Sequence, residues 1–322
     1  MKVLFVGLGS IGIRNLRACQ SVRPDYQYFA LRSGRGSATS SLQDSLSQLP
    51  QVVQDIGQVR ELRPDIAWIC NPTHAHASSV RDLAESCRSF FIEKPLAHTT
   101  QDLNEMEKVL TGNKALFFYG CVMRHHPVVQ AVKELLDSGT LGRVLSYTIH
   151  CGSYLPDWRP HSDYRKSYSA KKSEGGGVHL DLIHEFDFAQ LWFGRFKSLS
   201  GYCGRVSDLE LDSNDLCLAT SLHDAGARGQ ISLNYFERKP RRTFEITLSK
   251  GTITGDLIAS RLSWTDLSKE STKDFPCERD DLYRSQARQV FEVLEKGSPS
   301  PWNLKDAAEL NRQLVNWVEG AQ

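Results

Sequence analysis

The sequence predicts an α/β protein with two domains, a doubly wound parallel sheet at the N-terminus and then an α/β domain with a largely antiparallel sheet. The chain has 322 residues, 40% of them hydrophobic and 24% charged, which suits two cores of ordinary size. From residue 1 to about 120, short apolar runs alternate with longer amphipathic stretches, the pattern of βαβ units. In the later β-rich part, turn residues rather than helices separate the apolar runs.

The elements of the first domain follow from the spacing of apolar residues. Short apolar runs predict five parallel strands, at residues 3–6, 27–31, 66–70, 90–92 and 116–119. Helical periodicity predicts connecting helices over residues 11–21, 74–87 and 101–110. Thr99 or Thr100 is a natural N-cap for the last of these helices. We therefore assign residues 1–122 to the first domain.

The second domain, residues 123–322, begins with a helix. A helical pattern over residues 127–136 leads into residues 143–152, whose alternation predicts a strand with one wet face. Further β-rich runs predict the antiparallel sheet, at residues 217–222, 229–235, 244–248 and 258–264. Two helical stretches, residues 280–295 and 304–318, end the domain, with a Pro-containing loop between them.

Charge and composition exclude several classes of function. Lys and Arg number 39 and Asp and Glu 38, so the overall charge gives no reason to expect nucleic acid or an anionic membrane as partner. The apolar runs are too short to span a membrane, and the strand-like start leaves no room for a signal peptide, so we expect a cytoplasmic protein. The eight cysteines contain no C-x-x-C spacing and are expected to be reduced, mostly buried thiols.

A glycine-rich turn lies between the first predicted strand and the first predicted helix. Gly7, Gly9 and Gly12 fit the pattern G-x-G-x-x-G, with Ser10 and Ile11 inside it. The first glycine permits a tight turn, the second lets the backbone approach a pyrophosphate, and the third allows close packing of helix and strand. A glycine turn without a ligand is the alternative. The strand–turn–helix context favours dinucleotide binding.

The end of the second predicted strand indicates which dinucleotide binds. In NAD-selective folds an acidic residue about 20 positions after the turn accepts a hydrogen bond from the ribose 2′-hydroxyl. This chain instead has Arg32, Ser33 and Arg35, which suit a 2′-phosphate. The residues favour NADP over NAD as the cofactor. The alternative is that both arginines belong to a solvated loop.

Three further segments follow in order along the chain: Asn71 to His76, Glu93-Lys94-Pro95, and residues 175–187, which begin with three glycines. With the glycine turn, and with residues 283–293, they resemble the Gfo/Idh/MocA family of NAD(P)-dependent oxidoreductases. The resemblance implies a Rossmann domain followed by an α/β domain with an open antiparallel sheet. It implies an active site where the carboxyl ends of the parallel strands meet the second domain, and a homodimer or homotetramer formed through the open sheet.

The resemblance implies that Lys94 is an acid/base group. Hydride transfer needs a partner that accepts or donates the hydroxyl proton, and a lysine near a cationic nicotinamide in a partly dry cleft has a lowered pKa. From the residues alone, a solvated loop lysine is the alternative. The bond before Pro95 is expected to be cis, as the family's proline suggests. Glu93 is expected to orient Lys94 or to contact the nicotinamide ribose.

His184 and Asp181 are the other catalytic candidates. Imidazole titrates near neutral pH, and a carboxylate on the same helix face can orient it. The family spaces this pair four residues apart, whereas three separate them here, so the roles of the two residues stay open. Asp181 binding a substrate hydroxyl and His184 as a buried structural histidine are the alternatives. Asp187 is expected to be structural.

The remaining cofactor contacts come from the family segments. They are expected at Asn71, Pro72, His74, His76, Glu93, Lys94 and Arg124. Histidines cluster at three places in the sequence, which makes a metal site an alternative to consider. None of the clusters has a zinc spacing, and hydride transfer with a lysine acid needs no ion, so we expect no metal.

A basic and aromatic segment, residues 152–172, precedes the three glycines. It contains Trp158, Arg159 and Arg165, and aromatic faces stack on sugar rings while guanidinium groups neutralise a carboxylate or phosphate. The segment resembles members of the family linked to surface-sugar biosynthesis, which implies a sugar acid or a nucleotide-activated sugar as substrate. A solvated basic loop is the alternative.

The predicted function is hydride transfer between nicotinamide and a hydroxyl or carbonyl group of a sugar-type substrate. A non-catalytic NADP-binding regulatory protein is an alternative, because a nucleotide site alone does not prove chemistry. A biliverdin-reductase-like enzyme is another. It is disfavoured because a large apolar substrate does not call for Asp181 and His184.

Overall fold

The computed structural model describes residues 1–31, 50–266 and 268–320. Within these ranges the chain forms two compact units, Met1–Gly120 with Glu278–Glu309, and Cys121–Cys277 with the C-terminal segment from Leu310. The sequence prediction places residues 278–309 in the second domain, whereas their contacts place them in the first unit. The reason is helix α9 (Arg279–Lys296), which packs against helix α1 of that unit.

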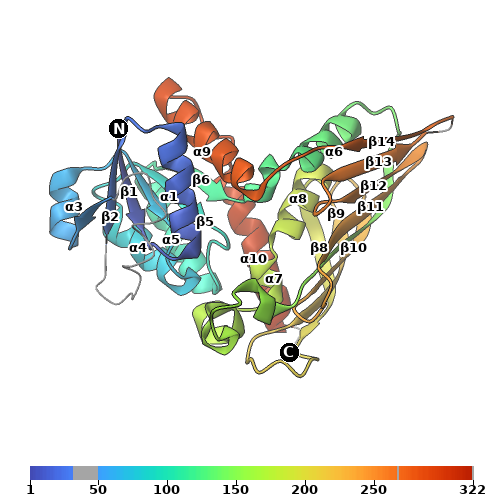
Figure 1. The fold of residues 1–322 in the computed structure, drawn as a ribbon, viewed down its shortest axis with the longest axis horizontal. Helices are drawn as coiled ribbons and strands as arrows, with labels where there is room; N and C mark the ends of the chain where they lie inside the picture. The colour runs from blue at the N-terminus through green and yellow to red at the C-terminus, as the bar shows by residue number, and fades with distance from the viewer. Residues whose placement is uncertain (32–49, 267, 321–322) are drawn as a thin grey trace. The chain divides into compact units, whose positions relative to one another are not determined.

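The first unit contains a six-stranded parallel sheet with strand order β3-β2-β1-β4-β5-β6 (Figure 1). This confirms the predicted doubly wound sheet. Strand β3 is missing from the prediction because it has three residues and two of them are exposed. The strands are β1 (Lys2–Val6), β2 (Gln27–Leu31), β3 (Gln51–Val53), β4 (Ile66–Ile69), β5 (Ser89–Glu93) and β6 (Leu116–Gly120).

The helices of this unit agree with the prediction except at two places. Thr99 caps α5 by accepting a hydrogen bond from the backbone N–H of Asp102. The stretch predicted as one helix from residue 74 is a 3-10 turn, η1 (Thr73–Ala75), followed by α4. Helix α3 was not predicted, because it buries Val59 alone and a single buried residue gives no apolar periodicity. The helices are α1 (Ser10–Val22), α3 (Ile56–Leu62), α4 (His76–Leu83) and α5 (Thr100–Gly112).

Stacked aromatic rings form the centre of the first unit. Trp68 of β4 is fully buried between Phe5 and Phe91 of the neighbouring strands, with ring centroids 5.7 and 4.2 Å away. The ring centroid of Phe291 of α9 lies 5.8 Å from that of the same indole. These contacts show why α9 folds with the first unit, since its apolar face completes that core.

The second unit contains an eight-stranded sheet with order β14-β13-β12-β11-β7-β10-β9-β8. Neighbours pair antiparallel except β7 and β10, which pair in parallel. Strands β8, β12 and β14 were not predicted, because β12 buries Ile253 alone and β14 is largely exposed. The strands are β7 (Val144–Gly152), β8 (Phe196–Gly204), β9 (Leu216–His223), β10 (Arg228–Asn234), β11 (Arg241–Leu248), β12 (Gly251–Asp256), β13 (Arg261–Thr265) and β14 (Glu270–Asp274).

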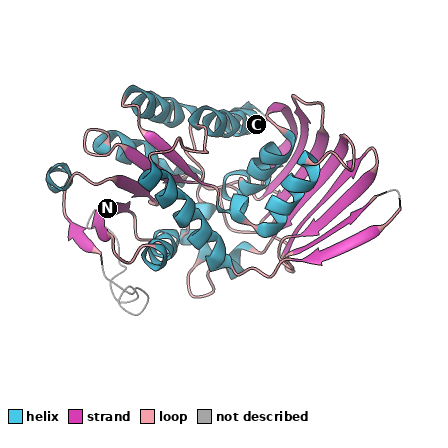
Figure 2. Cartoon of the chain, turned by 90° about the horizontal axis from the view of Figure 1, so that it is seen from above, coloured by secondary structure: helices cyan, strands magenta, loops and turns pink. Residues whose placement is uncertain are grey.

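Helices cover one face of this sheet (Figure 2). In β7, buried Tyr147, Ile149 and Cys151 alternate with more exposed residues, as expected for a sheet with one wet face. Phe193 of α8 stacks on Tyr147, with centroids 4.4 Å apart. Within the described ranges no helix packs on the opposite, open face. The helices of this unit are α6 (Pro127–Asp137), α7 (Val178–Asp181) and α8 (His184–Phe193), with α10 (Leu304–Gly320) shared between the units.

A search of the described residues found no helix with both the length and the hydropathy needed to cross a membrane.

Candidate functional site

Each glycine of the turn after β1 has a distinct steric role. Gly7 has φ +91°, and a Cβ on it would lie 2.5 Å from the backbone nitrogen of Asn71. A Cβ on Gly12 would lie 2.0 Å from the carbonyl oxygen of Gly7. A Cβ on Gly9 would meet no described atom within 4 Å. The first and third glycines therefore permit tight packing, and the second leaves open space in front of the turn.

The N-terminus of α1 faces this open space. Gly9 is the N-cap residue, and within the described chain no side chain caps the helix and no acidic residue lies in its first turn, which begins with Ser10 and Ile11. The first-turn N–H groups and the positive end of the helix dipole therefore suit an anion. The turn fits the pyrophosphate of a dinucleotide. Arg32, Ser33 and Arg35 lie outside the described residues.

The turn after β4 lies against the glycine turn through Asn71. The side-chain nitrogen of Asn71 donates to the hydroxyl of Ser79 at 2.8 Å, and its side-chain oxygen is buried without a hydrogen-bond partner among the described residues. Pro72 and His74 are exposed on this turn. The Asn71 oxygen is thus a polar atom next to the predicted pyrophosphate position with capacity for a further hydrogen bond.

His76 is buried and its ring connects two loops. Its Nε2 lies 2.9 Å from the carbonyl oxygen of Asn71, and its Nδ1 lies 3.1 Å from that of Leu96. Burial lowers the pKa of His76 to about 4. The ring has no exposed edge and joins the Asn71 turn to the loop after Lys94, and the cofactor contact of His76 stays a prediction.

The carboxyl end of β5 places Glu93 and Lys94 at the same edge of the sheet as the glycine turn, because parallel strands end on one side. The peptide bond between Lys94 and Pro95 is cis, as predicted. Lys94 is half-buried. Glu93 is 7% exposed and accepts a hydrogen bond from the backbone N–H of Lys94 at 3.3 Å. Burial raises the pKa of Glu93 to about 7.

A network of buried polar side chains, centred on Asn15, holds Glu93. The Asn15 amide donates to the Glu93 carboxylate at 2.8 Å and to the carbonyl oxygen of Ile11 at 3.1 Å. The Asn15 oxygen accepts from Trp68 Nε1 at 3.3 Å and from the amide of Gln286 at 3.4 Å. Neither Asn15 nor Gln286 was predicted from the sequence. The available signal was an amide side chain in the apolar stripe of a helix.

In the second unit, Asp181 and His184 do not share one helix face, which corrects the prediction. Helix α7 ends at Asp181, Leu182 leaves the helical conformation, and α8 begins at His184. The Asp181 carboxylate is held by the hydroxyl of Tyr235, which donates at 2.6 Å, and by a hydrogen bond from Tyr168. Sequence reasoning missed both tyrosines, because neither lies within a helical turn of Asp181 in the chain.

Arg124, in η2 (Val122–His125), forms a bidentate ion pair inside the second unit. Its Nε and Nη2 donate to the two carboxylate oxygens of Asp187 at 2.8 and 2.7 Å. The Asp187 side chain is 2% exposed, so this pair fixes the start of α8. The guanidinium of Arg124 thus binds a protein carboxylate. This contact was not predicted from the sequence, which assigned Arg124 to the cofactor.

Two residues of the basic segment lie around Asp181. Trp158 packs edge-on against Tyr235, with centroids 5.3 Å apart, and its indole N–H donates to Ser153 at 2.8 Å. The guanidinium of Arg159 lies 5.7 Å from the ring centroid of Tyr168. The structure therefore brings Trp158 and Arg159 to the two tyrosines that bind Asp181.

Arg165 has a different environment. It is exposed and pairs with Asp163 at 2.8 Å and with Glu210 at 3.2 Å. Its charge is therefore balanced by acidic side chains on the surface.

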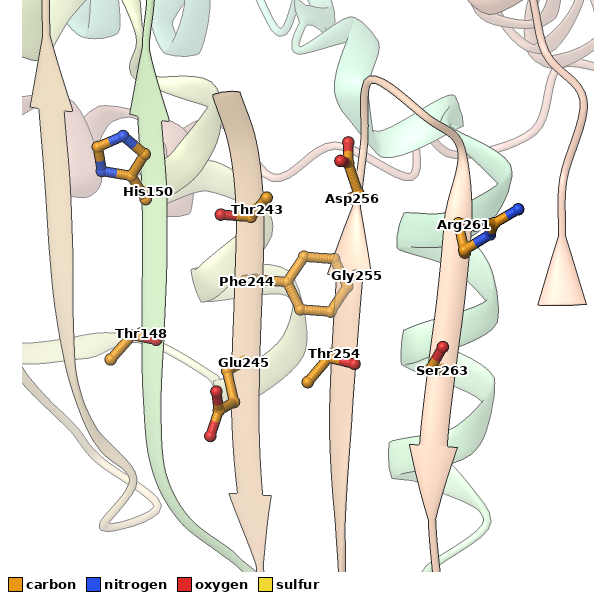
Figure 3. Close-up of a pocket in the computed structure, with 10 residues that line it drawn as sticks. All are labelled: Thr148, His150, Thr243, Phe244, Glu245, Thr254, Gly255, Asp256, Arg261 and Ser263. Atoms are coloured by element: carbon orange, nitrogen blue, oxygen red, sulfur yellow. The ribbon is translucent and has the colours of Figure 1, made fainter. Parts of the chain in front are cut away.

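A shallow hollow of about 400 Å³ lies on the open face of the larger sheet (Figure 3). Its polar lining includes His150, Glu245, Asp256 and Arg261, none of them a predicted site residue. His150 pairs with Glu237 at 2.7 Å, and Arg261 is paired as well. The hollow is therefore a feature of the open face rather than part of the predicted active site.

Two family models match the chain, one for each unit. Residues 1–121 match the family described as "Oxidoreductase family, NAD-binding Rossmann fold", and residues 129–254 match the "GFO/IDH/MocA C-terminal domain". Together the two matches cover most of the chain. The chain belongs to the Gfo/Idh/MocA family.

Named relatives show partial matches. A levoglucosan dehydrogenase from Pseudarthrobacter phenanthrenivorans is 30% identical over 141 residues, 42% of this chain and 35% of that protein. An inositol 2-dehydrogenase from Rhizobium meliloti is 32% identical over 131 residues, 40% of this chain and 37% of that protein. The chain thus spans little more than a third of the length of these relatives.

The fold likeness covers more of the chain. A solved levoglucosan dehydrogenase in complex with NADH superimposes with a TM-score of 0.87, over 100% of this chain and 98% of that one. The sequence identity is 16%, so this comparison shows the fold alone.

Proposed function

We propose that the protein is an NAD(P)-dependent dehydrogenase that acts on a secondary hydroxyl group of a sugar or polyol. The observation that carries the proposal lies within the first unit. The uncapped glycine turn after β1 and the half-buried Lys94 after β5 lie at the same edge of one parallel sheet. That edge is where doubly wound sheets bind their ligands. An anion site beside a titratable amine suits oxidation of an alcohol.

A nicotinamide dinucleotide held at the glycine turn would supply the hydride acceptor for oxidation of the substrate carbon. Lys94 Nζ takes the hydroxyl proton, or returns it in the reverse direction. Glu93 positions Lys94 by accepting a hydrogen bond from the backbone N–H of Lys94. Asn15 donates a hydrogen bond that holds Glu93 in turn. The chain therefore supplies an acid/base group, Lys94, that Glu93 positions directly and Asn15 positions through Glu93.

In the second unit, Asp181 and His184 are the candidates for substrate binding and proton transfer. Hydrogen bonds from Tyr235 and Tyr168 fix the Asp181 carboxylate, which then accepts a hydrogen bond from a hydroxyl group of the substrate. His184 assists proton transfer. Arg159, beside Tyr168, is placed to pair with a carboxylate or phosphate of a sugar acid or nucleotide-activated sugar. The names of the two dehydrogenase relatives, which act on levoglucosan and inositol, support a sugar-like substrate.

The preferred cofactor is proposed to be NADP, because Arg32, Ser33 and Arg35 follow the second strand where an NAD-selective chain has an acid. Arg32→Asp should weaken binding of NADPH by about tenfold or more and leave NADH binding no weaker. Fluorescence titration with each nucleotide measures this. Equal affinity for NADPH in both proteins contradicts the preference.

The experiment for the activity combines binding and turnover. Lys94→Ala should bind the nucleotide like the wild type yet lose about a hundredfold to ten-thousandfold in kcat on a panel of sugars, sugar acids and nucleotide sugars, because a general acid/base typically contributes that much. Lys108→Ala, an exposed lysine of α5, is the matched control and should turn over normally. Nucleotide binding with no turnover of any panel member would instead support a non-catalytic regulator.

A further inference from the structure

Two buried cysteines face each other across neighbouring strands of the second unit. Cys203 of β8 is directly opposite Cys217 of β9 in the antiparallel ladder. The side chains are 4% and 0% exposed, on the side of the sheet away from the open face. Directly opposite residues of an antiparallel pair have Cβ atoms about 4.5–5.5 Å apart, close to the separation that a disulfide requires.

The surroundings of the pair distinguish the two thiols. The Cys203 sulfur accepts a hydrogen bond from the side chain of Asn214 at 3.4 Å and interacts with Cys217 and with His179 of α7. Hydrogen bonds from Cys217, His179 and Asn214 lower the pKa of Cys203. The hydrogen bond that Cys217 donates to Cys203, together with burial, raises the pKa of Cys217. Cys203 is thus the better nucleophile, and Cys217 is a thiol held beside it.

His179 supplies a second, independent observation. It is 6% exposed, and its Nδ1 has no hydrogen-bond partner among the described residues. The ring lies close to Gly177, where a Cβ would be 2.8 Å from its Cε1. A buried imidazole next to a thiol is able to take the thiol proton and to return it to a leaving group.

We propose that Cys203 and Cys217 are a redox-active dithiol, which a peroxide oxidises to a disulfide with Cys203 as nucleophile, His179 as proton carrier and Cys217 as resolving thiol. Strand β8 is at one end of the described sheet, so its backbone opens more readily than that of a central strand (Figure 1). Hydrogen peroxide is small enough to reach the pair through such an opening.

The chemistry balances in two steps. The Cys203 thiolate, whose proton His179 holds, forms an S–O bond to one peroxide oxygen as the O–O bond breaks. The departing hydroxide takes the proton from His179 and leaves as water. The Cys217 sulfur then forms the S–S bond as the S–O bond breaks, and the second hydroxide takes the Cys217 proton. Two thiols are oxidised and one peroxide is reduced to two waters.

Oxidation would act on α7 and therefore on Asp181. Helix α7 packs against β9, and its Val178 N–H donates to the carbonyl oxygen of Asn214 at 2.8 Å. The Cys203 thiol accepts hydrogen bonds from both His179 and Asn214, and the disulfide removes this acceptor. His179 on α7 and Asn214 beside β9 must therefore both change their positions. This consequence rests on the proposed function, since it links the thiols to substrate binding by Asp181.

The test maps the thiols directly. The reduced full chain is treated with hydrogen peroxide, quenched with catalase, alkylated and digested for mass spectrometry. We expect a Cys203–Cys217 cross-link, loss of two alkylatable thiols and full reversal by dithiothreitol. Cys203→Ser and Cys217→Ser should lack the cross-link. Cys151→Ser, a buried cysteine on the same side of the sheet, should keep it. His179→Gln should slow cross-linking by about tenfold, because the proton carrier is lost.

Both cysteines recovered as alkylated thiols, or Cys203 over-oxidised while Cys217 stays reduced, would overturn the proposal. These readouts need only wild-type protein, so a variant that fails to fold does not obscure them. In turnover assays the oxidised enzyme should lose kcat/KM for substrate and keep its nucleotide affinity. The cross-link is detected by mass, so a failure of the proposed function leaves the thiol result intact.

Discussion

Glu93 is a buried carboxyl group whose main hydrogen-bond partner is the amide of Asn15. Asn15 donates to one of its oxygens, and the backbone N–H of Lys94 donates to the other. These two hydrogen bonds stabilise the carboxylate less than water does, so burial keeps the pKa of Glu93 at about 7. A proton is thus bound and released near neutral pH directly beside Lys94.

This pKa predicts how stability depends on pH. Because the folded pKa of about 7 lies above the unfolded value of 4.5, the folded state binds the proton more tightly. The free energy of unfolding should therefore fall by up to about 3 kcal/mol as pH rises from about 4 to 8. Glu93→Gln, which keeps the Asn15 contact, should remove this loss. Urea unfolding at a series of pH values measures it.

The control is Glu61→Gln at an exposed position of α3, which should leave the pH profile as in the wild type. A Glu93→Gln profile parallel to the wild-type curve from pH 4 to about 8 would show that the pH dependence does not come from Glu93.

Residues that act in pairs were the hardest to predict from sequence. Lys94 and Asp181 could be proposed as candidates from the sequence because short local motifs contain them. Tyr235 and Gln286 could not. Tyr235 meets Asp181, and Gln286 meets Asn15, only through contacts between residues 54 and 271 positions apart in the chain. No local periodicity records such a contact.

At the scale of elements, the β1–turn–α1 unit was predictable because its packing is local. The pattern of three glycines is the direct consequence of the close contacts among Gly7, Gly12 and Asn71. The break between α7 and α8 was not predictable, because Tyr235 and Tyr168 hold Asp181 at the end of α7. Strands such as β14, with little buried surface, also gave no signal.

The glycine turn allows binding and stability to be separated. Gly12→Ala should destabilise the protein by about 1–3 kcal/mol, because its Cβ would lie 2.0 Å from a backbone oxygen. Gly9→Ala should change stability by less than about 0.5 kcal/mol, since its Cβ enters open space. It should nevertheless weaken nucleotide binding by about tenfold or more, because the methyl group occupies the path of the pyrophosphate.

Thermal unfolding without ligand and fluorescence titration with NADPH and NADH measure the two effects. Gly139→Ala, in a turn of the second unit with φ +67°, is a control that should be destabilised without a change in nucleotide affinity. Gly9→Ala with unchanged affinity would remove the pyrophosphate from this turn.

At the scale of the whole molecule, the open face of the larger sheet is a surface that the fold leaves without a helix among the described residues. Tyr202 of β8 and Leu218 of β9 are opposite each other on it and are 46% and 45% exposed. We propose that a second copy of the chain covers this face, giving the homodimer or homotetramer that the family resemblance implies.

Leu218→Arg tests this proposal, because a two-fold interface would place the new charge on both copies at once. The variant should dissociate with a Kd raised by about a hundredfold, as expected for an unpaired charge in an interface core. Analytical ultracentrifugation measures the change. Val52→Arg, at an equally exposed residue of the first unit, should sediment like the wild type. Unchanged assembly of the Leu218 variant would place the interface elsewhere, since a buried arginine in the contact cannot be neutral to association.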